Sequence, residues 1–325
     1  MRLPMMRMEP ARIAAHVRAV SERLGACVTI SEVRQAYETY PLHPTLLPGV
    51  RSLEVEAPRG CWVGRTEFDP RRRGVYFHGG GFVAGSVGMY AGLISRIADA
   101  TWSWIFFCDY PRAPECLFPA AHAAAIGACD YARSNGPIGP DAANQLFAVG
   151  DSSGGGMVFA AAMHLRDQGR GHVLDALIGL SPMLDLTAAG SSYTRCATTD
   201  ALVSAQSARQ CAGGYAPGID PLDPRLSPLF GSFENLPPVM LQVSDDEVVC
   251  DDSTRAAHAI EHCGGQVELQ RWPGLPHVWQ LLAGCHVLEC QPWRGQPMTG
   301  AANPRRGDRA SVRIDPDDLT RGQPR

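Results

Sequence analysis

Short apolar runs alternate with longer amphipathic stretches along most of the chain. Apolar runs of strand length lie at residues 53–56, 62–68, 74–77, 104–108, 146–149, 177–180, 239–243 and 267–270. Stretches with helical spacing follow them near residues 87–100, 119–134, 153–167, 203–213 and 252–263. Strands and helices that alternate at this spacing predict an α/β protein with a mostly parallel sheet, covered by helices on both faces.

The two ends of the chain depart from this alternation. Near the N-terminus, Ile13, Val17 and Val20 repeat at helical spacing, and Gly25 is placed to end a helix. Residues 291–325 are rich in Arg, Pro, Gly and Asp and contain few large apolar side chains. A segment of that composition cannot bury enough apolar surface to fold, so we predict a disordered C-terminal tail.

Composition and charge narrow the chemistry. The chain has 325 residues, of which 45% are hydrophobic and 19% charged, which is typical of a soluble globular protein. Its formal net charge of −4 offers no basic field, so we expect no nucleic acid partner and no anionic membrane surface. All 29 basic residues are arginine, which excludes Schiff bases, Ser–Lys dyads and phosphate loops that end in lysine.

The cysteines and histidines do not form a recognisable metal motif. The 11 cysteines are odd in number and contain no C-x-x-C pair, which indicates reduced side chains that pack as small apolar groups. Cys285, His286 and Cys290 are conceivable ligands, and so are His258 and His262, four apart on a predicted helix, but Glu261 is misplaced for the H-E-x-x-H motif. We expect no metal and no cofactor. No signal peptide and no apolar run of about 18 residues is present, so a cytoplasmic protein without a membrane span is expected.

Two adjacent serines lie among glycines in the sequence GDSSGGG, residues 150–156. An apolar run precedes this sequence and a helical stretch follows it. Gly-x-Ser-x-Gly between a strand and a helix is typical of a nucleophile elbow, in which a serine is held at the tip of a strained turn. A Cβ atom at either flanking glycine would collide with the neighbouring strand or helix. The pattern predicts Ser152 as the nucleophile, directly followed by Ser153.

A second glycine-rich sequence, HGGG at residues 78–81, follows the apolar run at 74–77. Backbone N–H groups of such a loop can approach a developing oxyanion, because no side chains block the way. Alone, the sequence could be an ordinary glycine turn. Followed by an elbow later in the chain, it indicates an acyl-transfer site.

Together these motifs resemble the hormone-sensitive-lipase-like family of α/β-hydrolases, and within it the bacterial carboxylesterases and monoterpene lactone hydrolases. The shared blocks, in the family's order, are YFHGGGFVAGS, DY-x-x-APE-x-x-FPAA, GDSSGGG, SPMLDL, DPRLSPL, DDEVVCDD and PHVWQ. The resemblance implies an α/β-hydrolase fold with a small helical cap. We therefore expect an N-terminal cap segment at residues 1–50, a catalytic domain at 51–284 with a cap insertion at about 186–222, and the disordered tail at 285–325.

The resemblance also implies roles for individual residues. Gly80 and Gly81 match the loop whose N–H groups bind the oxyanion, and the N–H group of Ser153 is the third donor. His277 follows the last predicted strand, as expected for the base in a fold whose chain order is serine, acid, histidine. His78 is expected to brace the glycine loop by hydrogen bonding.

The acid of the triad is less clearly marked, because residues 244–253 contain five carboxylates. Glu247 aligns with the family's catalytic acid, and Asp251 aligns with a structural residue at the start of the next helix. A glutamate is one methylene longer than the more common aspartate and can still hold an imidazole tautomer. Asp246, one position earlier, remains the alternative.

The sequence therefore predicts a serine carboxylesterase with a Ser-His-Glu triad and an acyl-enzyme intermediate, acting on short- to medium-chain esters. Three alternatives stay open: a lactone hydrolase with the same triad, a non-catalytic ligand-binding homologue, and a damaged pseudoenzyme. Non-catalytic homologues lack the histidine, so His277 argues for an enzyme. The expected partner is a small ester or lactone, and a homodimer is left open. Two departures from the family are the sequence YPRAPE at 110–115 and the end of the pattern near Gly284, before the usual last helix.

Overall fold

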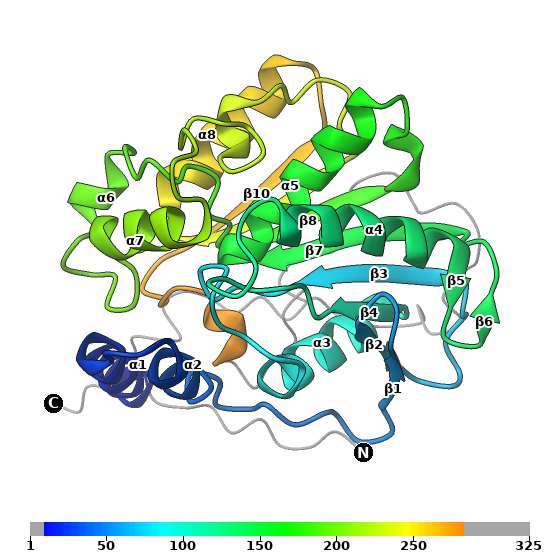
Figure 1. The fold of residues 1–325 in the computed structure, drawn as a ribbon, viewed down its shortest axis with the longest axis horizontal. Coiled ribbons are helices and arrows are strands. Elements are labelled where there is room, and N and C mark those ends of the chain that lie inside the picture. The colour runs from blue at the N-terminus through cyan, green and yellow to red at the C-terminus, as the bar shows by residue number, and fades with distance from the viewer. Residues whose placement is uncertain (1–9, 283–325) are drawn as a thin grey trace, which may run out of the picture.

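The computed structural model describes residues 10–282, which form an eight-stranded sheet with helices on both faces (Figure 1). Its strand order is β1-β2-β4-β3-β7-β8-β9-β10. The strands are β1 (Arg51–Val55), β2 (Gly60–Gly64), β3 (Arg72–Phe77), β4 (Trp104–Cys108), β7 (Gln145–Asp151), β8 (Ala176–Leu180), β9 (Val239–Ser244) and β10 (Val267–Trp272). The pairs β1–β2 and β2–β4 are antiparallel, and every later pair is parallel. The predicted mostly parallel sheet is confirmed.

The helices that cover the sheet lie on two sides. Figure 1 shows α4 (Ala120–Ser134), α5 (Ser152–Asp167) and α8 (Cys250–His262) on one face, and α3 (Val87–Thr101) on the other. Most residues of the central strands are buried because both faces of the sheet are covered. Val75, Phe106 and Ala148, one from each of three neighbouring strands, are fully buried.

Four further helices lie beside the carboxyl-terminal ends of the parallel strands (Figure 1). Two come from the N-terminal segment, α1 (Pro10–Ala26) and α2 (Ile30–Tyr37). The other two, α6 (Ser192–Arg195) and α7 (Ala205–Tyr215), come from the predicted insertion at about 186–222. Active sites of open α/β sheets form at the carboxyl-terminal ends of the strands, so these helices lie where a cap would be expected.

Smaller elements complete the described chain. A two-stranded hairpin is made of β5 (Asn135–Gly136) and β6 (Gly139–Pro140). Short 3-10 helices are η1 (Gly171–Val173), η2 (Pro228–Phe230) and η3 (Trp279–Leu281). None of the helices between residues 10 and 282 is long and apolar enough to cross a membrane. The predicted tail at 285–325, which includes Cys285, His286 and Cys290, lies outside the described residues.

One local prediction was wrong, and one helix was missed. The strand expected at 62–68 is β2 at Gly60–Gly64, because the chain turns where Phe68 N–H donates to the carbonyl group of Arg65, 3.1 Å away. Helix α2 was missed, although Thr29 and Glu32 mark its start. The Thr29 hydroxyl group accepts a hydrogen bond from the Glu32 N–H, and the Glu32 carboxylate accepts one from the Thr29 N–H, which makes a capping box.

Candidate active site

Ser152 occupies the sharp turn between β7 and α5, at the end of the strands where α1, α2, α6 and α7 lie. Its φ of 50° is a left-handed conformation, which a side chain other than glycine rarely adopts. A Cβ atom at Gly150 would come within 2.4 Å of the Gly154 carbonyl oxygen, and one at Gly154 within 2.1 Å of the Phe77 carbonyl oxygen. The predicted reason for the flanking glycines is confirmed: the turn has no room for a side chain at either of these two positions.

His277 lies between Ser152 and Glu247, although the three residues are far apart in the sequence. Its Nε2 atom is 3.0 Å from the Ser152 Oγ atom, and its Nδ1 atom is 2.6 Å from Glu247 Oε2. The exposed fractions are 5% for Ser152, 3% for His277 and 0% for Glu247. Ser152 follows β7, Glu247 follows β9 and His277 follows β10. These three side chains thus form one buried line of hydrogen bonds, from a carboxylate through an imidazole to a hydroxyl group.

The two candidates for the acid occupy different places. Glu247 Oε2 faces the imidazole, while Oε1 accepts hydrogen bonds of 2.8 Å from the Ser244 N–H and from the Ser181 hydroxyl group. The Asp246 carboxylate points elsewhere and accepts a hydrogen bond of 2.5 Å from the Gly274 N–H. Of the two side chains, the structure brings Glu247 to the histidine.

Burial and pairing set the protonation of this pair. Burial raises the pKa of Glu247 above its usual value, and the hydrogen bond from His277 opposes that shift. Burial also disfavours the His277 imidazolium, but the adjacent Glu247 outweighs it and raises the pKa of His277. A histidine whose protonated form is stabilised by a buried carboxylate is suited to accept a proton from a nearby hydroxyl group.

The glycine loop of residues 78–81 lies against the residue that precedes Ser152, since the Gly79 N–H donates to the Asp151 carboxylate at 2.9 Å. Gly80 and Gly81 have φ angles of 108° and 61°, which favour glycine. Among residues 10–282, neither N–H group donates a hydrogen bond to a backbone carbonyl group. Ser153 lies in the first turn of α5, where backbone N–H groups have no partner within the helix. Its Oγ atom is buried without a partner in the described part of the chain.

Asp151 fixes the glycine loop, a role that sequence reasoning missed. Its buried carboxylate accepts hydrogen bonds from the Gly79 N–H at 2.9 Å, the Tyr76 hydroxyl at 2.7 Å and the Tyr90 hydroxyl at 2.9 Å. Burial raises the pKa of Asp151 to about 6, although these three donors oppose the shift. Asp151, the residue before Ser152, therefore ties the turn of Ser152 to the loop of Gly80. An acid at the end of an apolar run was the signal available in the sequence.

His78 supports the same loop from beneath. Its Nδ1 atom lies 2.7 Å from the Gly79 carbonyl oxygen, and its ring stacks on Tyr110 with centroids 4.1 Å apart. Burial lowers the pKa of His78 to about 3, so the ring is neutral at physiological pH. The side chain makes the bracing hydrogen bond that was expected of it.

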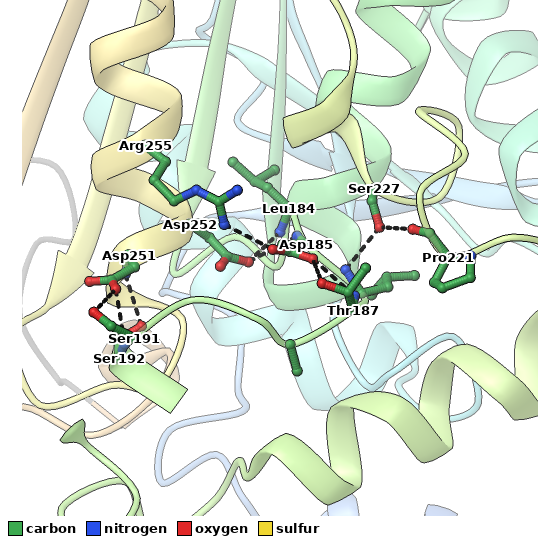
Figure 2. A network of polar contacts seen from close by, with 12 residues as sticks. Leu184, Asp185, Thr187, Ser191, Ser192, Pro221, Ser227, Asp251, Asp252 and Arg255 are labelled. Carbon is green, nitrogen blue, oxygen red and sulfur yellow. Dashed lines mark hydrogen bonds and ion pairs between the residues drawn. The ribbon is translucent and has the colours of Figure 1, made fainter. Parts of the chain in front are cut away.

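Asp251 differs from its predicted role. Helix α8 starts one residue earlier, at Cys250, and the Asp251 carboxylate does not cap it. Figure 2 shows that carboxylate bound instead to Ser191 and Ser192 at the start of α6, at 2.6 and 2.9 Å. Asp251 therefore joins α8 to the insertion.

The neighbouring Asp252 is fully buried and accepts hydrogen bonds from the backbone N–H groups of Leu184 and Asp185, at 2.8 and 3.0 Å (Figure 2). Arg255 donates to the Asp185 carboxylate at 2.8 Å. A groove of about 620 Å³ lies over this network and includes Asp185, Asp251 and Arg255 among its lining residues, but not Ser152 or His277. The network joins α8 to residues 184–192 and does not include the side chains of Ser152, His277 or Glu247.

Fold and site together define a class of protein, and comparison with known proteins identifies it. Residues 74–281 match the model of a family described as having the alpha/beta hydrolase fold, so the chain belongs to that family. Within it, the protein is a carboxylic ester hydrolase of the hormone-sensitive-lipase type, a serine-type esterase.

Three similar proteins support this placement. An acetyl-hydrolase of Streptomyces hygroscopicus is 34% identical over 219 residues, which span 67% of this chain and 71% of that protein. An esterase of Acinetobacter venetianus is 30% identical over 244 residues, 75% of this chain and 76% of that one. The crystal structure of an esterase from the bacterial hormone-sensitive lipase family superimposes with a TM-score of 0.76 at 30% identity, covering 84% and 90% of the two chains.

Proposed function

We propose that this protein hydrolyses short- to medium-chain carboxylic esters with a triad of Ser152, His277 and Glu247. The observation that carries the proposal is the buried line of hydrogen bonds from Glu247 Oε2 through both nitrogens of His277 to Ser152 Oγ. A serine hydroxyl is a weak nucleophile unless a base stands within hydrogen-bonding distance and a third group orients that base. Both conditions are met at 3.0 and 2.6 Å.

Acylation begins when Ser152 Oγ attacks the ester carbonyl carbon and its proton passes to His277 Nε2. The carbonyl π electrons move to oxygen, and the N–H groups of Gly80, Gly81 and Ser153 bind the resulting oxyanion. Collapse of this intermediate breaks the bond to the alcohol oxygen, which takes the proton from Nε2. The products of this half-reaction are the free alcohol and an acyl ester of Ser152. Glu247 keeps the imidazole in one tautomer and compensates its positive charge throughout.

Deacylation repeats the same steps with water as the nucleophile. His277 Nε2 takes a proton from water as the water oxygen attacks the acyl carbon, and the oxyanion binds the same three donors. Breaking the bond to Ser152 Oγ returns the proton to that oxygen and releases the carboxylic acid. No cofactor takes part in the proposed cycle.

The preference for short acyl groups rests on the relatives. One is named an acetyl-hydrolase, and another, from Pseudomonas putida and 30% identical over 206 residues, is named an ethyl acetate hydrolase. A lactone is a cyclic ester that the same machinery would open, so lactone hydrolysis remains the second activity to test. The presence of His277 within hydrogen-bonding distance of Ser152 supports an enzyme over a non-catalytic homologue.

The deciding experiment measures hydrolysis of p-nitrophenyl esters from acetate to palmitate, with a terpene lactone assayed in parallel. We expect kcat/KM to be highest for the short and medium esters. A p-nitrophenyl alkylphosphonate should label one residue per chain, and peptide mass spectrometry should locate the adduct on Ser152. Labelling elsewhere, or esterase activity that survives in Ser152→Ala, would overturn the proposal. Faster turnover of the lactone than of every ester would favour the lactone hydrolase.

A further inference from the structure

Residues 30–40, comprising α2 and the turn after it, contact three separate parts of the proposed site. We propose that this segment, the N-terminal arm, positions His277 and the glycine loop for catalysis. The proposal rests on the proposed function and adds residues from outside the matched region, which begins at residue 74. The arm acts through three side chains: Arg34, Tyr37 and Tyr40.

Tyr40 holds the loop that carries His277. Its hydroxyl group donates a hydrogen bond to the backbone carbonyl oxygen of His277, and its side chain is fully buried. The next residue, Val278, has φ 48° and ψ 49°. A β-branched residue in this left-handed conformation is strained and persists only when its surroundings hold it there.

The strained position is restrained from both sides. The Tyr40 hydroxyl group binds the carbonyl group before Val278, and the Ser181 hydroxyl group accepts a hydrogen bond of 3.3 Å from the Val278 N–H. Removing the first restraint would let the peptide between residues 277 and 278 relax and turn the imidazole away from Ser152. A displacement of about 1 Å can lower a catalytic rate by about 10²-fold.

Arg34 holds the turn that follows the glycine loop. Its Nε atom donates to the Val83 carbonyl group at 2.8 Å, and one terminal nitrogen donates to the Ala113 carbonyl group at 3.0 Å. The Val83 N–H in turn donates to the Gly80 carbonyl group at 3.1 Å, so this turn shares its geometry with the proposed oxyanion donors. The same guanidinium group also donates two hydrogen bonds, of 2.8 and 2.6 Å, to the exposed carboxylate of Glu115.

Tyr37 packs on the glycine loop itself. A Cβ atom at Gly80 would lie 3.1 Å from Tyr37 Cε1, which shows how closely the ring covers that residue. The Tyr37 hydroxyl group is 3.3 Å from that of Tyr90, which accepts a hydrogen bond from the Gly79 N–H and donates one to Asp151. The arm thus extends the hydrogen-bond network that fixes the loop beside Ser152.

None of these three contacts involves a reacting atom, so the arm consists of positioning residues. The first test is Tyr40→Phe, which removes only the hydroxyl group. We expect kcat to fall about ten- to a hundredfold, with KM changed less than about twofold, because substrate contacts are kept. The matched control is Tyr193→Phe. Tyr193 is also buried, and within residues 10–282 its hydroxyl group has no hydrogen-bond partner, so kcat should stay as in the wild type.

Three further measurements separate positioning from partial unfolding. Titration with the p-nitrophenyl alkylphosphonate should give the same number of reactive Ser152 sites in Tyr40→Phe as in the wild type, at a lower rate. The ascending limb of the pH–rate profile should move to lower pH, because a displaced imidazole loses part of its contact with Glu247. Arg34→Ala should also lower kcat, whereas Glu115→Gln, which leaves the Arg34 bonds to Val83 and Ala113 intact, should change it little.

The outcomes for the arm and for the proposed function are distinct. A wild-type protein that takes up no phosphonate at Ser152 would refute the triad. A wild type that is labelled at Ser152, beside a Tyr40→Phe variant with equal kcat and labelling rate, would leave the triad intact and overturn the arm. A reduced number of reactive sites without a slower rate per site would also overturn it, since that result means loss of folded protein.

Discussion

The hydroxyl group of Ser181 donates a hydrogen bond of 2.8 Å to Oε1 of Glu247. The Ser244 N–H donates to the same oxygen at the same distance, so Oε2 alone is left to pair with His277. A glutamate has one more rotatable bond than an aspartate and is harder to hold in one orientation. Two donors on one oxygen remove that freedom. The longer acid can therefore hold the imidazole as firmly as the shorter one.

Glu247→Gln should lower kcat by about 10³–10⁴-fold while the fold stays intact. The amide can turn its NH₂ group toward Nδ1 of His277, which favours the wrong tautomer and removes the counter-charge of the imidazolium. Asp246→Asn is the control, because that side chain binds the Gly274 N–H and not the histidine. Steady-state kinetics and melting temperatures of both variants provide the measurement. A larger loss of kcat in Asp246→Asn, at an unchanged melting temperature, would contradict the assignment.

The rate should rise with pH through the ionisation of His277, since only the neutral imidazole accepts a proton from Ser152. Glu247 raises the pKa of His277 above its usual value of 6.5, so the midpoint of kcat/KM should lie above pH 6.5. In Glu247→Gln this cause is lost and burial, which lowers the pKa, remains. The midpoint of the residual activity should then move to lower pH. A midpoint that does not move would show that another group controls the profile.

Ser152→Ala should abolish ester hydrolysis, whereas Ser153→Ala should keep most of it. The alanine at 153 retains the backbone N–H group proposed to bind the oxyanion. The Ser153 hydroxyl group has no hydrogen-bond partner in the described structure, so removal of this hydroxyl group should not destabilise the fold. Assays with p-nitrophenyl acetate and thermal melts of both variants test this. Equal loss of activity in the two would mean that the nucleophile has been misassigned.

Gly154→Ala should prevent formation of the elbow, because the added Cβ would lie 2.1 Å from the Phe77 carbonyl oxygen and 2.5 Å from that of His78. Gly127→Ala is the matched control within α4. Within residues 10–282, no heavy atom outside the adjoining helix backbone lies within 4 Å of the Cβ it would add, and alanine favours a helix over glycine by about 0.5–1 kcal/mol. We therefore expect an inactive, destabilised first variant and a slightly more stable second one. Urea denaturation and esterase assays measure both; an active Gly154→Ala enzyme would refute the steric argument.

Asp252→Asn should change how stability depends on pH. Burial raises the pKa of Asp252 from 3.8 to about 8 in the folded protein. The unfolded chain releases this proton at lower pH, so between about pH 4 and 8 the site makes folding progressively less favourable as pH rises, and no further above that. The neutral amide has no such ionisation. The stability difference between Asp252→Asn and the wild type should therefore grow in the variant's favour from pH 5 to pH 8 in urea titrations. A constant difference would contradict it.

The fold and the position of Ser152 could be predicted because their signals are local. Alternating apolar runs mark the strands, and the Gly-x-Ser-x-Gly pattern marks the elbow, although only the clash at Gly150 is with a near neighbour, Gly154, while the clash at Gly154 is with Phe77 of another strand. His277 could be found because it follows the last predicted strand within a recognisable motif. Each of these signals can be read within a short stretch of the sequence.

The parts that were missed depend on such contacts. Nothing near Asp151 in the sequence shows that its carboxylate meets Tyr90 and the Gly79 N–H. Asp251 was expected at the start of the next helix from the resemblance to the family, but its carboxylate binds Ser191 and Ser192 of a distant segment. Helix α2 had a readable capping box. The hydrogen bonds from its Arg34 to the Val83 and Ala113 carbonyl groups could not be inferred, because they join segments far apart in the sequence.

The hydrogen bond from Tyr40 to His277 joins residues 237 positions apart. During synthesis the ribosome delivers the N-terminal arm first and the histidine loop near the end of the described fold. A nascent chain that has emerged as far as β8 holds the arm and Ser152, but neither Glu247 nor His277. Closing so long a loop is slow, because chain entropy is lost before the contact forms. On the proposed triad, a growing chain cannot react with esters until nearly all of the described fold has left the ribosome.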